Sequence, residues 1–166
     1  KKNNELNNQY SGDKNNSGYK IGIIISRFNA PVTDNLLKGA LAALKINGIN
    51  ESCIEVFYVP GAFEIPALLK KLCKINSLKK RFDGILTLGC VIKGGTAHFE
   101  YISSTVTQNI GIISAEYEIP VGFCVLTCYT PLQAFERSGM PPDAENNKGF
   151  EAAESLLEMV SLMNKL

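Results

Sequence analysis

The sequence has a single histidine, no C-x-x-C pair among its five cysteines, little net charge and no long apolar run. No apolar segment reaches the roughly 20 residues that a membrane-spanning helix needs. The N-terminus is rich in asparagine and lysine rather than apolar, so we expect no signal peptide. The formal net charge is +1, with lysines and acids dispersed, which gives no basic surface for nucleic acid or an anionic membrane.

The cysteines favour a reducing, cytoplasmic compartment. Their number is odd and most of them lie in apolar runs, which is more typical of buried thiols than of the alternative, a disulfide framework. One histidine cannot form a His-rich metal site, and its neighbours lack the spacing of metal ligands, so no metal is predicted. The 166 residues suit one domain over 19–166, preceded by a polar, Asn-rich tail over 1–18 that we expect to be disordered.

Short apolar segments alternate with segments of helical periodicity. Strands are predicted at 20–26, 54–59, 84–92 and 121–127, and helices at 36–44 (ending near Gly48), 63–75, 99–117, 131–138 and 148–166. Continuous apolar strands joined by helices indicate a parallel sheet covered on both faces. The fold class is therefore α/β, a three-layer α/β/α sandwich with a four-stranded parallel sheet. Ligands of such sheets bind beyond the carboxyl ends of the strands.

The first two strand-exit loops could bind a flat, polar molecule. Neither a G-x-G-x-x-G nor a P-loop motif follows the first strand, which argues against nucleotide binding. Phe28 instead could stack on a heterocycle, or could equally be a core residue. Gly61 to Glu64 open a helix, where free N–H groups can bind a ligand edge. Glu64 could bind the ligand or only complement the helix dipole.

The third loop combines groups for an anion and for proton transfer. Lys93-Gly94-Gly95-Thr96 precedes a helix, so its backbone N–H groups can approach a phosphate. His98 could transfer protons, or could make only a structural hydrogen bond at the helix start. Arg137 suits a phosphate ester but could be a surface arginine, and Lys148 is equally ambiguous. No Ser/His/Asp set is present, which favours a cofactor-free reaction of a small phosphorylated substrate with a planar partner.

The loops closely resemble those of the lumazine synthase family, over residues 19–166. The segments are IGIIISRFNAPVTDNLLKGAL from Ile21, VPGAFEIP from Val59, GCVIKGGTAHFEY from Gly89, LQAFERSG and NKGFEAA. The family has a flavodoxin-like fold and makes 6,7-dimethyl-8-ribityllumazine for riboflavin biosynthesis, without a cofactor. Its substrates are 5-amino-6-(ribitylamino)uracil and 3,4-dihydroxy-2-butanone 4-phosphate, and it releases phosphate and water.

The resemblance implies a role for each loop. Residues implied to bind the aminouracil are Phe28, which stacks on the pyrimidine, Ala62, Phe63, Glu64, Cys90, Val91, Ile92, and Phe123 of an adjacent subunit. Those implied to hold the butanone phosphate are Gly95, Thr96 and Arg137, and His98 matches the proton-transfer residue. The resemblance further implies a homopentamer with active sites at subunit interfaces, and leaves riboflavin synthase open as a partner.

Three departures from the family pattern stand out. Lys93 stands where the family often has arginine but keeps the charge, and the pair Cys128-Tyr129 replaces a commoner polar pair, with no evident reason for Tyr129. The segment 138–147 is longer than in members that form sixty-subunit shells and contains two prolines, which favours a pentamer that forms no shell. The alternatives are a catalytically inactive lumazine- or flavin-binding or shell-forming relative, and a phosphate-handling enzyme of another flavodoxin-like family.

Overall fold

The computed structural model describes residues 8–14 and 18–166, in which four strands form one parallel sheet. The strands are β1 (Ile21–Ser26), β2 (Ile54–Val59), β3 (Gly84–Ile92) and β4 (Val121–Cys128), and their order in the sheet is β2-β1-β3-β4. All six residues of β1 are buried, because this strand has a neighbour on each side and helices on both faces. The high content of isoleucine in β1, four of its six residues, fits this double burial.

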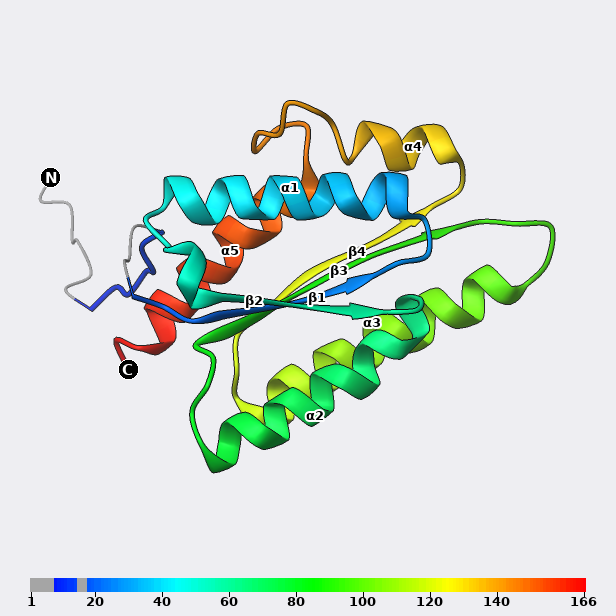
Figure 1. Ribbon diagram of the computed structural model, residues 1–166. Coiled ribbons are helices and arrows are strands. Elements are labelled where there is room, and N and C mark those ends of the chain that lie inside the picture. The colour runs from blue at the N-terminus through cyan, green and yellow to red at the C-terminus, as the bar shows by residue number, and fades with distance from the viewer. Residues whose placement is uncertain (1–7, 15–17) are drawn as a thin grey trace, which may run out of the picture.

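Helices cover both faces of the sheet. They are α1 (Ala30–Ile46), α2 (Ile65–Leu78), α3 (His98–Tyr117), α4 (Pro131–Glu136) and α5 (Lys148–Met163). Helices α1, α4 and α5 lie on one face and α2 and α3 on the other (Figure 1). The predicted three-layer α/β/α sandwich is therefore confirmed. Among the described residues, no helix is both long and apolar enough to cross a bilayer.

The helix ends differ from the predictions by a few residues, for local reasons. Gly48 adopts φ 86° just beyond α1, and its N–H donates to the carbonyl of Lys45 at 3.1 Å, so the predicted end is confirmed. The helix predicted from Phe63 begins at Ile65, after a 3₁₀ turn η2 (Ala62–Glu64). The helix predicted to reach Ser138 ends at Glu136, because Ser138 pairs with Asn147 in an isolated β-bridge.

The strand order places a crevice between β1 and β3. Within the sheet, β2 pairs with one edge of β1, and β3 pairs with the opposite edge of β1. The connections leaving β1 and β3 therefore run to opposite faces at their carboxyl ends, as α1 and α3 do in Figure 1. Ligands of open α/β sheets bind at such a switch point.

The five cysteines all lie within the described residues and all are free, as predicted. All except Cys53 are buried. Burial raises the pKa of the Cys73 thiol to about 11 and that of the Cys124 thiol to about 12. These thiols stay protonated near neutral pH, so they behave as small apolar core residues.

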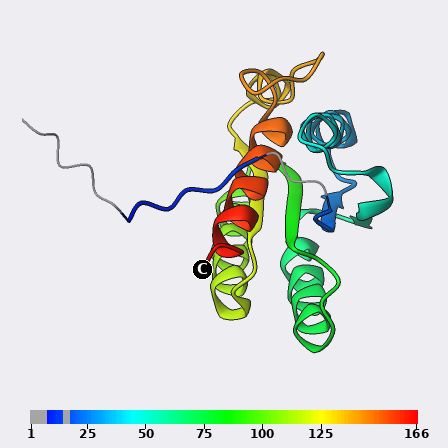
Figure 2. The same cartoon turned by 90° about the vertical axis from the view of Figure 1, so that its left-hand side faces the viewer.

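A short part of the predicted tail contacts α5. The tail over 1–18 includes residues 1–7 and 15–17, which lie outside the described residues, so its disorder stays a prediction. Residues 8–14 have no helix or strand and run toward α5 (Figure 2). The N–H of Asp13 donates to the hydroxyl of Ser161 at 3.0 Å, and the ammonium of Lys165 lies 2.8 Å from the Asp13 carboxylate.

Candidate active site

A cavity of about 420 Å³ lies at the carboxyl ends of β1 and β3, beside the start of α3. It is thus at the switch point of the sheet. Eight residues predicted for the site line it: Phe28, Ala62, Phe63, Cys90, Val91, Ile92, Thr96 and His98. Three separate exit loops and the end of β3 therefore meet around one space. The remaining predicted residues, Glu64, Gly95, Phe123 and Arg137, do not line it.

The loop after β1 holds Phe28 at the edge of this cavity. Its side chain is 71% exposed, so Phe28 is not a core residue. The N–H of Phe28 donates to the carbonyl of Pro60 at 3.0 Å. Asn29 adopts the left-handed conformation (φ 61°), and its side-chain amide donates to the carbonyl of Cys90 at 2.9 Å. These bonds fix the loop to the neighbouring strands, which leaves the ring free to stack on a planar ligand.

The loop after β2 presents backbone groups and a second aromatic ring to the cavity. Gly61, Ala62 and the exposed Phe63 line it. The Glu64 carboxylate accepts a hydrogen bond from the N–H of Gly61 at 2.9 Å, which caps the helix start. Glu64 therefore stabilises the loop that lines the cavity, and this bond occupies only one of its two carboxylate oxygens.

The loop after β3 is open where a phosphate would bind. Gly94 and Thr96 line the cavity, whereas Gly95 does not. A Cβ at Gly94 or at Gly95 would meet no described atom within 4 Å, so packing does not require glycine there. The glycines instead leave the backbone N–H groups accessible, just before the N-terminus of α3.

His98 is the side chain in this cavity best suited to proton transfer. It is exposed at the first position of α3, and among the described residues no hydrogen-bond partner holds its imidazole. This finding disfavours the alternative of a structural hydrogen bond. Burial, with a smaller effect of nearby Cys128, raises the pKa of the Cys90 thiol to about 12. Cys90 stays neutral near pH 7 and cannot serve as a thiolate nucleophile.

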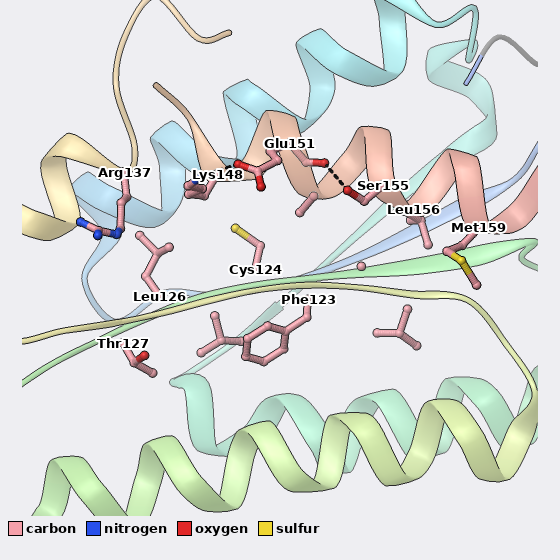
Figure 3. A pocket seen from close by; sticks show the side chains of 14 residues that line it. Phe123, Cys124, Leu126, Thr127, Arg137, Lys148, Glu151, Ser155, Leu156 and Met159 are labelled. Carbon is pink, nitrogen blue, oxygen red and sulfur yellow. Dashed lines mark hydrogen bonds and ion pairs between the residues drawn. The ribbon is translucent and has the colours of Figure 1, made fainter. Parts of the chain in front are cut away.

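Phe123, Arg137 and Lys148 line a second groove, of about 410 Å³, between β4 and α5. Arg137 and Lys148 lie at one end of this groove, and Phe123 projects from the other side of β4 than Cys124 (Figure 3). The Arg137 guanidinium donates to the carbonyl of Gln133 at 3.2 Å, and the ammonium of Lys148 pairs with Glu151. None of the described residues lines both spaces, so one chain divides the predicted site into two parts.

Four cavity residues and one supporting residue were missing from the predicted site residues. Gly61, Gly94, Phe99 and Ile102 line the cavity, and Asn29 holds the loop beside it. Ile102 could have been predicted, because it lies four residues after His98 and therefore on the same side of the helix. The bond from Asn29 joins positions 61 residues apart, and no local pattern reveals such a contact.

A comparison with protein families agrees with this arrangement. Residues 18–164 match the family model of 6,7-dimethyl-8-ribityllumazine synthase. The chain belongs to the lumazine synthase family. This is a family of transferases in riboflavin biosynthesis, with a flavodoxin-like fold. The matched residues include all four strand-exit loops, so the cavity and the groove are both built from segments shared with the lumazine synthase family.

Within the described residues, no group of three or more His, Cys, Asp or Glu side chains is placed to hold a metal ion. Apart from Cys90, the residues with polar side chains that line the cavity are Thr96 and His98, and the loops around it also supply backbone amides. Such groups bind neutral ring edges and phosphate oxygens. The site of this lumazine synthase family member is thus suited to positioning and proton transfer.

Proposed function

We propose that the protein is an active lumazine synthase. It condenses 5-amino-6-(ribitylamino)uracil with 3,4-dihydroxy-2-butanone 4-phosphate to 6,7-dimethyl-8-ribityllumazine, and releases phosphate and water. The observation that carries the proposal is the meeting of Phe28, the Thr96 loop and His98 around one cavity, in a chain of this family. In this order, these groups can stack on a planar ring, bind a phosphate and transfer a proton.

The aminouracil is assigned to the cavity. Phe28 stacks on the pyrimidine, and the backbone of Cys90 to Ile92 contacts the ring edge. Ala62, Phe63 and Glu64 bind the ribityl chain or the ring edge. The exposure of Phe28 and the accessible helix start after Gly61 support this assignment.

The phosphate site is assigned to two subunits. Gly95 and Thr96 hold the phosphate of the butanone from the cavity side, and Arg137 reaches it from the groove of an adjacent subunit, whose Phe123 contacts the aminouracil. The separation of the cavity from the groove within one chain supports an active site at a subunit interface. An exposed arginine and an exposed phenylalanine in one open groove also suit contact with a partner copy.

The reaction then needs orientation and proton relay. The 5-amino group attacks the ketone to give a carbinolamine, which loses water to form an imine. Phosphate leaves with the C–O bonding electrons, and the resulting enol tautomerises and closes the second ring with loss of water. His98 moves protons between nitrogen, carbon and oxygen in these steps. Amine and ketone are reactive by themselves, so proximity and orientation supply much of the rate.

The decisive assay mixes the purified protein with both substrates and follows the fluorescent lumazine. We expect product well above the spontaneous rate. In the Arg137→Ala variant we expect the KM for the butanone phosphate to rise about 10- to 100-fold, as for a lost charge-assisted contact, with little change in the KM for the aminouracil. Ligand binding without turnover by the folded protein would support the inactive relative instead.

We expect the protein to assemble as a pentamer and to form no shell. The segment between α4 and α5 makes hydrogen bonds within itself, among them the Asn146 side-chain amide to the Pro141 carbonyl at 2.8 Å. A long segment at this place hinders the packing of pentamers around a threefold axis. Light scattering and analytical ultracentrifugation measure the particle mass. A particle of shell size would contradict the prediction.

A further inference from the structure

Tyr129 has no role in the fold or in the binding scheme above. It follows β4 directly, and its side chain is 67% exposed, so burial in the core does not account for it. Tyr129 lines neither the cavity nor the groove. An exposed aromatic residue at the exit of a strand, next to a ligand cavity, needs another explanation.

The ring of Tyr129 contacts both ends of the loop that the phosphate is assigned to. Its centroid lies 6.0 Å from that of Phe99, with the two planes tilted by 40°. The ammonium of Lys93 lies 5.6 Å from the same centroid. Both distances are within the range of favourable aromatic and cation–π contacts. Lys93 directly precedes the loop 94–97, and Phe99 follows it by two residues.

Tyr129 is itself well fixed. Its N–H donates to the side-chain carbonyl of Gln133 at 2.8 Å, and the preceding carbonyl, of Cys128, accepts from the N–H of Lys93 at 2.9 Å. The backbone that carries the ring is therefore hydrogen-bonded both to α4 and to the residue that follows β3. All four residues of the loop 94–97 are exposed, and its last residue alone has a described backbone hydrogen bond, from the N–H of Glu100 to the carbonyl of Ala97 at 3.2 Å.

We infer that Tyr129 is a positioning residue for the phosphate loop. By contacting Lys93 and Phe99 together, its ring restricts both ends of the loop 94–97, so less conformational entropy is lost when the loop closes on a phosphate. Its ring also holds the Lys93 ammonium beside the start of the loop. Among the described residues, the only ion-pair partner of this ammonium is Glu100, at 3.8 Å. The inference rests on the proposed function.

The test compares Tyr129→Ala with Tyr129→Phe and with Leu132→Ala. Leu132 is a matched control because it is also 67% exposed and lies three residues further on, in α4. We expect Tyr129→Ala to raise the KM for the butanone phosphate about 3- to 10-fold, the effect of leaving one or two more side chains to be ordered on binding. The KM for the aminouracil and the thermal midpoint stay unchanged. Tyr129→Phe keeps the ring and behaves like the wild type, as does Leu132→Ala.

Calorimetry with inorganic phosphate separates this inference from the proposed function. If the wild-type protein makes no lumazine, the proposed activity fails, while the phosphate affinities of the same variants still decide the role of Tyr129. An unchanged phosphate affinity and an unchanged KM in Tyr129→Ala would overturn the inference. So would an equal rise of both KM values, since that indicates a general structural effect. If the alanine variant does not assemble, Tyr129→Leu, which keeps bulk but lacks a ring, replaces it.

Discussion

Replacing His98 by alanine is expected to lower kcat by about 10²-fold, the lower end of the range for general acid–base catalysis. The imidazole lies at the first position of α3, lines the cavity, and has no hydrogen-bond partner among the described residues. Its removal therefore takes away a proton relay without removing a structural contact. The KM values should change little, because the alanine variant keeps Phe28 and the loop 94–97.

Activity should not be lost completely. Imine formation between an amine and a ketone proceeds in water, and a site that only holds the two substrates side by side still accelerates it. Steady-state fluorescence of the lumazine product gives kcat and KM for both substrates. His98→Gln is the matched variant, because it keeps a polar side chain of similar length but cannot take up a proton near neutral pH. Both variants should be slowed to a similar extent.

Two results would contradict this role of His98. A wild-type rate in His98→Ala would assign proton transfer to water or to another group. Complete loss in a folded, assembled variant would mean that His98 does more than relay protons. The thermal midpoint and the particle mass of each variant must match the wild type for either conclusion.

The fold could be predicted in detail because its signals are local. The run IGIII of β1 is buried on both faces, and such a strand has no polar positions that would obscure it. Gly48, just beyond α1, has a positive φ, a conformation that glycine adopts more easily than any other residue. The errors at the helix ends come from contacts that residue patterns do not contain, such as the bridge between Ser138 and Asn147.

The candidate site could be predicted only in part. Strand exits identify the loops that meet, so the sequence alone placed Phe28, Thr96 and His98 together. The resemblance implied that Phe123 comes from an adjacent subunit, but nothing in the sequence showed that Arg137 shares a separate groove with it, because that groove is formed where the end of α4 and the start of α5 pack beside β4. The contact of Tyr129 with Phe99 depends on side-chain positions from two elements, and it too leaves no sequence pattern.

Asn147 provides the second large expected effect, on stability rather than on chemistry. It is buried and is the N-cap of α5, where its side-chain oxygen accepts from the N–H groups of Gly149 at 2.9 Å and Phe150 at 3.2 Å. Its side-chain amide donates to the carbonyls of Asn35 at 3.0 Å and Gly139 at 3.1 Å. One side chain thus connects α5 to α1 and to the segment after α4.

Asn147→Ala is expected to lower the free energy of unfolding by about 2–4 kcal/mol, from a lost N-cap and buried carbonyls left without donors. Asn146→Ala is the matched control. Asn146 also makes two side-chain hydrogen bonds, to Asp143 and Pro141, but within an exposed segment, so we expect a loss below about 1 kcal/mol. Urea unfolding at a fixed protomer concentration measures both values. Equal losses in the two variants would contradict a special role for Asn147.

The same substitution should also weaken the assigned phosphate site, through Arg137. The N–H of Lys148, the residue after Asn147, donates to the carbonyl of Arg137 at 2.8 Å, and the neighbours Ser138 and Asn147 form a β-bridge. A loosened start of α5 therefore releases the backbone that carries the guanidinium. We expect the folded fraction of Asn147→Ala to show a raised KM for the butanone phosphate and an unchanged KM for the aminouracil, whose assigned contacts, apart from Glu64 and Phe123, line the cavity. A rise in the KM for the aminouracil alone would contradict this assignment, because it would mean that the start of α5 supports the aminouracil site and not the phosphate site.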